Sequence, residues 1–160
     1  KASLLAGATD ERIALTAGNG SGAGGAGCFR VMGEGSEDLA AIVETFPDWF
    51  APTLAAYVGR EDALPFDQHW LKAAVAPRPL LSTEALGDRW ANPRGTWRTF
   101  EAARTLYRFL GVDDRIGIRY RPGGHALTLD DFQSLLAFAD WQFRGIRPGR
   151  PFDACPFDDA

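Results

Sequence analysis

Three short apolar segments separated by helical patterns constrain the fold more than any other feature of this chain. They cover residues 13–17, 80–83 and 115–120, and the third alternates Ile116 and Ile118 with a glycine and an arginine. Strands that alternate with helices along a sequence indicate a parallel sheet whose connections cross over through the helices. We therefore predict an α/β protein with a parallel sheet and flanking helices.

Helical periodicity is clearest over residues 94–110, where apolar side chains recur at intervals of three and four. Shorter helices are predicted over residues 37–45 and 67–76. Residues 128–131 have the pattern of a capping box, which predicts the start of the last helix. The apolar side chains expected on one face of that helix are Phe132, Leu135, Leu136, Ala139 and Phe143.

The composition is that of a globular domain and argues against several classes of partner. With 160 residues, of which 46% are hydrophobic, the chain can form one domain with a substantial core. The net charge is −4 and no long basic run occurs, so nucleic acid is not expected as a partner. No run of about 18 apolar residues is found, so no membrane-spanning segment is predicted.

Cysteine and histidine are too sparse to predict a metal site or a disulfide framework. The two cysteines, Cys28 and Cys155, lie far apart in the sequence and can either pair or stay free. The two histidines, His69 and His125, are also widely separated, and no paired ligand spacing occurs. We expect neither a metal nor another cofactor.

Two polar residues follow the second and third predicted strands, at the strand ends where parallel sheets bind ligands. Asp88 lies in the loop after the second strand, and His125 follows a Gly–Gly pair after the third. An imidazole titrates near neutral pH, so His125 is a candidate general base that Asp88 would orient. Glu84, nearer the strand, is the alternative acid. A structural role is the other interpretation of His125, and it is the one we prefer for His69.

Acid before histidine is the chain order of the triad in α/β-hydrolases, in which the nucleophile precedes both. The serine nucleophile of that fold lies in a Gly-x-Ser-x-Gly elbow, and this sequence has no such motif. We therefore expect the chain to be the C-terminal part of an α/β-hydrolase whose nucleophile lies upstream of Lys1.

Two tryptophans are candidates for contact with a sugar ring, because an indole offers an apolar face and an N–H donor. Trp90 lies beside Asp88 in a polar loop, which favours a position in a cleft. Trp49 lies in an aromatic segment, which favours packing in the core. The glycine-rich segment 18–27 lacks the Lys-Ser/Thr ending of a phosphate loop, and we expect it to allow a close approach of main chain to a neighbour.

Seven segments occur in an order that resembles one family of esterases. They include Phe-Pro-Asp-Trp-Phe at 46–50 and Gly-Gly-His-Ala at 123–126. The full set covers residues 1–16, 21–30, 46–50, 64–69, 76–80, 88–95 and 123–126. On these segments the chain resembles the glucuronoyl esterases of carbohydrate esterase family fifteen, over residues 1–145. Residues 146–160 are expected to form a Pro/Gly-rich tail.

The resemblance implies a serine esterase of the α/β-hydrolase fold with His125 as the catalytic base. Many members carry the triad acid as a glutamate where this chain has Gly20. A subset of bacterial members uses an aspartate after the later strand instead, and Asp88 matches that position. The resemblance therefore implies Asp88 as the acid, in agreement with its place after the second predicted strand.

The resemblance also implies the substrate and the residues that bind it. Lys1 matches the last residue of the family's elbow, Gly-x-Ser-Arg-x-Gly-Lys, and is expected to contact the uronate sugar together with Trp90 and Glu37. The implied bond is an ester between 4-O-methyl-glucuronate on xylan and a lignin alcohol, cleaved by a secreted or periplasmic enzyme of lignocellulose degradation. The alternatives are another carbohydrate esterase, such as an acetyl xylan esterase, and a carbohydrate-binding module without catalysis.

Overall fold

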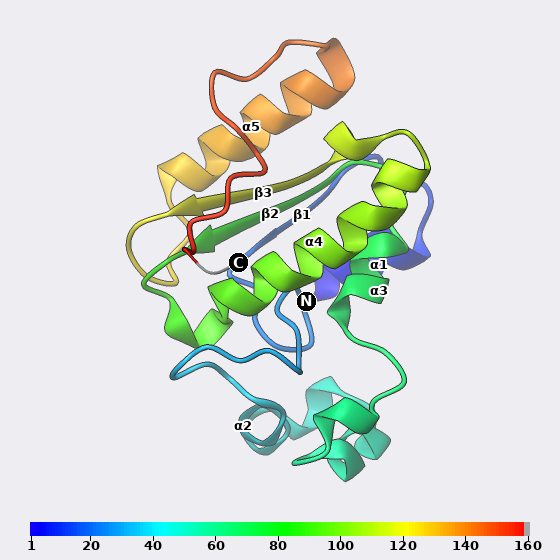
Figure 1. Cartoon of the computed structure of the whole chain (residues 1–160), viewed down its shortest axis with the longest axis vertical. Helices are drawn as coiled ribbons and strands as arrows, with labels where there is room; N and C mark the ends of the chain where they lie inside the picture. Colours follow the sequence, from blue (N-terminus) through cyan, green and yellow to red (C-terminus); the bar gives the residue numbers. More distant parts are fainter. Residues whose placement is uncertain (159–160) are drawn as a thin grey trace.

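The computed structural model describes residues 1–158, and its centre is a three-stranded parallel sheet (Figure 1). The strands lie side by side in chain order as β1 (Thr16–Asn19), β2 (Leu80–Ala85) and β3 (Ile116–Arg121). The register pairs Thr16 with Leu80 and Leu80 with Ile116. This sheet, with helices on both faces, confirms the predicted α/β class.

The sheet separates two hydrophobic cores because successive side chains of a strand point to opposite faces. On one face pack α1 (Ala2–Thr9), α3 (Gln68–Ala73) and α4 (Pro93–Phe109), and Leu80 of β2 belongs to their core. On the other face packs α5 (Leu129–Arg144), where Leu81 of β2 contacts Phe138. Figure 1 shows α4 and α5 on opposite sides of the strands.

A loop-rich lobe lies beside the sheet, at the bottom of Figure 1. It contains α2 (Leu39–Thr45) and three short 3-10 helices, Pro47–Trp49, Pro52–Tyr57 and Glu61–Ala63. The lobe has a core of its own, made of Ala23, Phe29, Leu39, Ile42 and Leu64. The molecule therefore combines a regular sheet-and-helix part with a lobe held mainly by aromatic and aliphatic contacts.

The predicted elements exist, but several begin or end at other residues. The first strand, predicted over 13–17, is β1 at Thr16–Asn19, because the Arg78 guanidinium binds one carbonyl of α1 and two of the turn that follows it. The helix predicted over 37–45 begins at Leu39, because the Asp38 side chain caps it. The helix predicted over 67–76 is α3, before which the Asp67 side chain accepts a hydrogen bond from Gln68 N–H. Two further 3-10 turns cover Arg89–Ala91 and Asp113–Arg115.

The predicted start of α5 is confirmed, but the predicted apolar face is only partly buried, with Leu135 packed against the core. Thr128 and Asp131 form the expected capping box. Phe132, Leu136 and Phe143 are exposed, whereas Asp131, Ser134 and Phe138 are buried. The reason is that Asp131 forms an ion pair with the buried Arg121 of β3, which turns the polar side of the first helical turn towards the sheet. Within residues 1–158 no helix is long and apolar enough to cross a membrane.

The segment after α5, expected as a tail, packs along the outer strand. Ile118 N–H of β3 donates to Phe152 O at 2.7 Å, and the Phe152 side chain lies in the core beneath α5. Phe157 meets Tyr120 edge to face, with 5.6 Å between ring centroids. Both cysteines are free, Cys28 buried and Cys155 exposed.

Candidate active site

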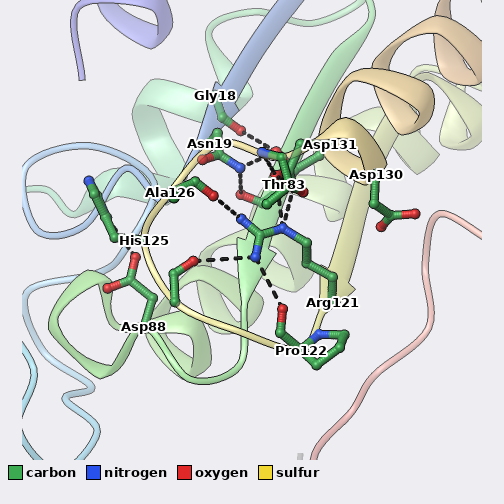
Figure 2. Close-up of polar contacts among 12 residues, drawn as sticks. Gly18, Asn19, Thr83, Asp88, Arg121, Pro122, His125, Ala126, Asp130 and Asp131 are labelled. Atoms are coloured by element: carbon green, nitrogen blue, oxygen red, sulfur yellow. Dashed lines mark hydrogen bonds and ion pairs between the residues drawn. The ribbon is translucent and has the colours of Figure 1, made fainter.

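Two loops at the carboxyl ends of β2 and β3 bring the predicted acid and histidine into contact (Figure 2). His125 Nδ1 lies 2.7 Å from Asp88 Oδ2. The Asp88 side chain is 6% exposed, whereas that of His125 is 72% exposed. A carboxylate only accepts hydrogen bonds, so the proton of the neutral imidazole lies on Nδ1 and Nε2 is the basic nitrogen. Such a pair can take a proton from a hydroxyl group at Nε2.

Main-chain hydrogen bonds join the two loops by continuing the β2–β3 ladder beyond the strands. Leu86 N–H donates to Arg121 O at 2.9 Å, and Gly87 N–H donates to Gly123 O at 2.9 Å. A Cβ atom at Gly87 would lie 2.6 Å from Gly123 O, so glycine is required for this approach. Because the acid and the histidine follow directly after these bonds, their separation is set by the main chain.

The glycine-rich loop approaches a neighbour closely at Gly20, as predicted for this segment. Gly20 N–H donates to Thr83 O at 3.0 Å, and its φ of 49° lies in the left-handed region that favours glycine. A Cβ atom there would lie 3.1 Å from Asp88 Oδ2 and 3.3 Å from His125 Nδ1. A side chain at this position would therefore crowd the acid–histidine pair.

Glu84, the alternative acid, is buried between β2 and the helices and away from this contact. The ammonium group of Lys72 is buried with it and donates to Thr96 O at 3.1 Å. Burial raises the pKa of the Glu84 carboxyl and lowers the pKa of the Lys72 amino group, while the attraction between them opposes both shifts. The structure places Asp88, rather than Glu84, against His125.

The three predicted sugar-binding residues form one connected group, which we call the Glu37 cluster. Glu37 is 2% exposed, and its Oε2 lies 3.5 Å from Lys1 Nζ. Its Oε1 accepts a hydrogen bond from Trp90 Nε1 at 3.1 Å. Trp90 is 48% exposed, and its expected position in a cleft stays a prediction because it does not line the cavity described below. The Glu37 cluster thus joins an ammonium group and an indole to one buried carboxylate.

A cavity of about 970 Å³ extends from His125 and Lys1 along an aromatic wall. The wall contains Phe29, Trp49, Phe50, Phe66 and Trp70. The prediction that Trp49 packs in the core is wrong, because 56% of it is exposed. It stacks on Phe46 with 3.9 Å between ring centroids, and Lys1 Nζ lies 5.2 Å from its centroid. The α2 lobe therefore uses this indole to line the cavity, not to fill its core.

The second histidine lies outside the acid–histidine pair. His69 is in α3, where its ring centroid is 5.6 Å from that of Trp70. Among the residues that the structure describes, no group of three or more His, Cys, Asp or Glu side chains is placed to hold a metal ion. His125, which contacts Asp88, is therefore the histidine with the geometry of a general base.

Comparison with known proteins places the chain in a family. A sequence profile described as "Glucuronyl esterase, fungi" matches residues 1–111, which is more than half of the chain. The chain belongs to the glucuronoyl esterase family. Its relatives include the carbohydrate esterase MZ0003 from an unknown prokaryotic organism, which is 39% identical over 160 residues, 91% of this chain. A 4-O-methyl-glucuronoyl methylesterase 1 from Wolfiporia cocos is 38% identical over 151 residues, 88% of this chain.

Solved glucuronoyl esterases share the fold. A carbohydrate esterase family 15 (CE15) glucuronoyl esterase from Caldicellulosiruptor kristjansonii superimposes with a TM-score of 0.93 at 42% identity, over 98% of this chain and 44% of that one. The catalytic domain of the glucuronoyl esterase from Hypocrea jecorina gives a TM-score of 0.81 at 31% identity, over 95% and 43%. The chain also spans only 37% of MZ0003 and 36% of the Wolfiporia protein. It therefore represents less than half the length of these glucuronoyl esterases.

The sequence patterns did not single out every residue that shapes this candidate site. Arg121 and Asp131 hold the loop that carries His125, and neither was predicted as a residue of the site. The available signals were weak: an arginine ends an apolar strand, and an aspartate completes a capping box. Each pattern has an ordinary structural explanation, so only the folded arrangement reveals that the two side chains meet.

Proposed function

We propose that the whole protein is a serine-type carboxylic ester hydrolase that cleaves glucuronoyl esters. The natural bond is the ester between 4-O-methyl-glucuronate on xylan and a lignin alcohol. The observation that carries the proposal is the 2.7 Å contact between His125 Nδ1 and Asp88 Oδ2 at the ends of neighbouring parallel strands. That contact gives the chain two members of a nucleophile–acid–histidine triad in the chain order of α/β-hydrolases.

In this proposal His125 moves the protons of both half-reactions. Its Nε2 accepts the proton of the serine hydroxyl as the serine oxygen attacks the uronoyl carbonyl carbon. It then gives that proton to the alcohol oxygen, so the ester bond breaks and an acyl-enzyme forms. Water, deprotonated in the same way, releases the uronic acid and restores the serine. Asp88 holds the imidazole in one tautomer and stabilises the imidazolium.

The nucleophilic serine comes from the upstream part of the same protein, together with an arginine that assists the oxyanion hole. Two features of the structure support an upstream partner for the sheet. Within the described residues β1 pairs only with β2, so its other edge offers free main-chain groups. Apolar side chains of both helical layers are exposed, including Leu5 of α1, Phe132 and Leu136 of α5.

The Glu37 cluster binds the sugar of the uronate. A buried carboxylate accepts hydrogen bonds from sugar hydroxyls, and an ammonium group donates to them. The half-exposed Trp90 offers an apolar face for the ring. Relatives named 4-O-methyl-glucuronoyl methylesterase, such as the Wolfiporia protein, support this substrate class. Because its polymeric substrate lies outside cells, we propose that the protein is secreted or periplasmic.

The test is an assay of the parent protein, upstream part included, on benzyl D-glucuronate and on an aryl acetate. We expect preferential cleavage of the glucuronate, lost in His125→Ala and in Asp88→Ala. His69→Ala, which removes the histidine outside the pair, is the matched control and should retain activity. Preference for the acetate would indicate an acetyl xylan esterase-like enzyme. Cleavage of neither ester, with retained binding of glucuronoxylan, would indicate a non-catalytic carbohydrate-binding module.

A further inference from the structure

The loop that carries His125 has no regular secondary structure, yet a single side chain satisfies several of its carbonyls. Pro122 O and Gly124 O accept hydrogen bonds at 3.1 and 3.3 Å. Ala126 O accepts another at 2.5 Å. All three donors belong to the guanidinium of Arg121, around which the loop curves in Figure 2. The loop therefore has a polar centre in place of a hydrophobic one.

The rest of that guanidinium faces a buried carboxylate. Arg121 Nε lies 2.9 and 2.8 Å from the two oxygens of Asp131, and the side chains are 7% and 3% exposed. Asp131 Oδ2 also accepts hydrogen bonds from the N–H and the hydroxyl of Thr128, each at 2.8 Å. The loop is thereby fastened to β3 through Arg121 and to the first turn of α5 through Asp131.

A buried ion pair is a costly way to hold a loop, which indicates a purpose besides stability. Taking each of these charges out of water costs several kcal/mol. Well-packed apolar residues in place of such a pair often stabilise a fold equally well. The guanidinium offers five N–H donors in a fixed plane, whereas lysine offers a single point charge. The neighbouring Asp130 points away in Figure 2 and binds Arg150 at 2.9 Å.

We propose that Arg121, held by Asp131, is a positioning residue for His125. By fixing the carbonyls on both sides of His125, it holds Nδ1 against Asp88 and directs Nε2 towards the substrate. An imidazole that is 72% exposed has little side-chain packing of its own, so the main chain must supply its order. The inference rests on the proposed function, in which His125 is the general base.

The first test is the Arg121→Lys variant of the parent protein, assayed on benzyl D-glucuronate. Lysine retains a charge for Asp131 but cannot reach three carbonyls and a carboxylate together. We expect kcat to fall about 100-fold, because small displacements of a catalytic group have effects of that size, with KM unchanged. Asp131→Asn retains the size of the side chain and should lower kcat less.

A second measurement needs no substrate and separates this inference from the proposed function. The proton between His125 Nδ1 and Asp88 gives a low-field NMR signal in such pairs. We expect Arg121→Lys to weaken this signal in the parent protein. If the parent cleaves no glucuronoyl ester but the signal still depends on Arg121, the proposed function fails and the positioning role stands.

The matched controls are two similar changes elsewhere. Asp130→Asn alters the adjacent carboxylate, and Arg104→Lys alters a guanidinium that binds Asp113 at 2.6 Å and Asp153 at 3.1 Å. Both should leave kcat and the NMR signal unchanged.

Three outcomes decide the proposal. An Arg121→Lys variant that retains its kcat and its His125 signal would overturn it. A fall in kcat that only follows the unfolded fraction, measured by circular dichroism, would also overturn it. If Arg121→Lys does not fold, Asp131→Asn decides the question by the same two measurements.

Discussion

The acid–histidine pair and the Glu37 cluster are built in opposite ways. The separation of Asp88 and His125 is set by main-chain bonds between their loops and by the guanidinium of Arg121. The Glu37 cluster depends on one buried carboxylate, which contacts both other members directly. The proposed catalytic pair is thus placed on an extended sheet, whereas the proposed sugar-binding residues come from segments joined at a single side chain. Changes to the first should act on kcat, and changes to the second on KM.

The largest effect is expected from His125→Gln, which retains a polar side chain but removes the base. Loss of a triad member lowers kcat by about ten-thousand-fold or more, and KM should stay unchanged because the imidazole does not hold the sugar. Initial rates of the parent protein on benzyl D-glucuronate measure both constants. A rise in KM with kcat retained would show that His125 binds the sugar instead.

The second-largest effect is expected from Asp88→Asn, which tests whether the buried carboxylate acts by fixing the tautomer of His125. The amide can donate to Nδ1 of His125, which would leave Nε2 protonated and unable to accept the serine proton. We expect kcat to fall about a thousand-fold to ten-thousand-fold. The comparison variant is Glu84→Gln, in the buried alternative acid. Greater loss of kcat in Glu84→Gln than in Asp88→Asn would move the acid to Glu84.

In the other region, Glu37→Gln should act on binding. The substitution removes the charge that pairs with Lys1 and accepts from Trp90. Hydrogen bonds to a charged group contribute about 1.5–3 kcal/mol, so KM should rise about 10- to 100-fold with a small change in kcat. Direct binding of D-glucuronate by calorimetry checks the same loss. An unchanged KM would refute the sugar-binding role of the Glu37 cluster.

Trp90→Phe is a smaller change in the same cluster. It retains an aromatic face but removes the N–H that donates to Glu37 Oε1 at 3.1 Å. A hydrogen bond to this charged group contributes about 1.5 kcal/mol at the lower end of its range, so KM should rise roughly ten-fold. If Trp90→Phe and Glu37→Gln together raise KM no further than Glu37→Gln alone, the two residues act as one unit.

The smallest effect is expected on the stability of the fold at low pH, and it concerns the region of the acid–histidine pair alone. Burial alone would raise the pKa of Asp131, but hydrogen bonds from Arg121 and Thr128 outweigh it and hold that pKa below its ordinary 3.8. A lowered pKa in the folded state stabilises the fold above pH 3.8 and loses that contribution as the pH falls through the folded value. Asp131→Asn should therefore flatten the dependence of Tm on pH below 3.8. An identical slope in both proteins would contradict this linkage.

Sequence patterns were sufficient for the class of fold and for the contact between Asp88 and His125. Strand–helix alternation and the strand-end positions of Asp88 and His125 do not depend on tertiary detail. Sequence patterns gave wrong or incomplete predictions where one tertiary contact overrides a local pattern. The apolar pattern of α5 does not show that Asp131 is buried as well, because a pattern of apolar residues carries no information on its ion pair with Arg121. Trp49 was mispredicted because an aromatic segment can line a cavity as readily as fill a core.

Because the edge of β3 is covered, a further strand can be added to the sheet on one side and not on the other. Phe152 O occupies Ile118 N–H on the outer strand, so pairing at that side meets main chain already in use. The edge of β1 is the one that stays open among the described residues. A strand on a separate polypeptide can therefore pair with the sheet at the edge of β1. On these grounds we expect that a separate piece bearing the proposed nucleophile restores the proposed activity when mixed with this chain.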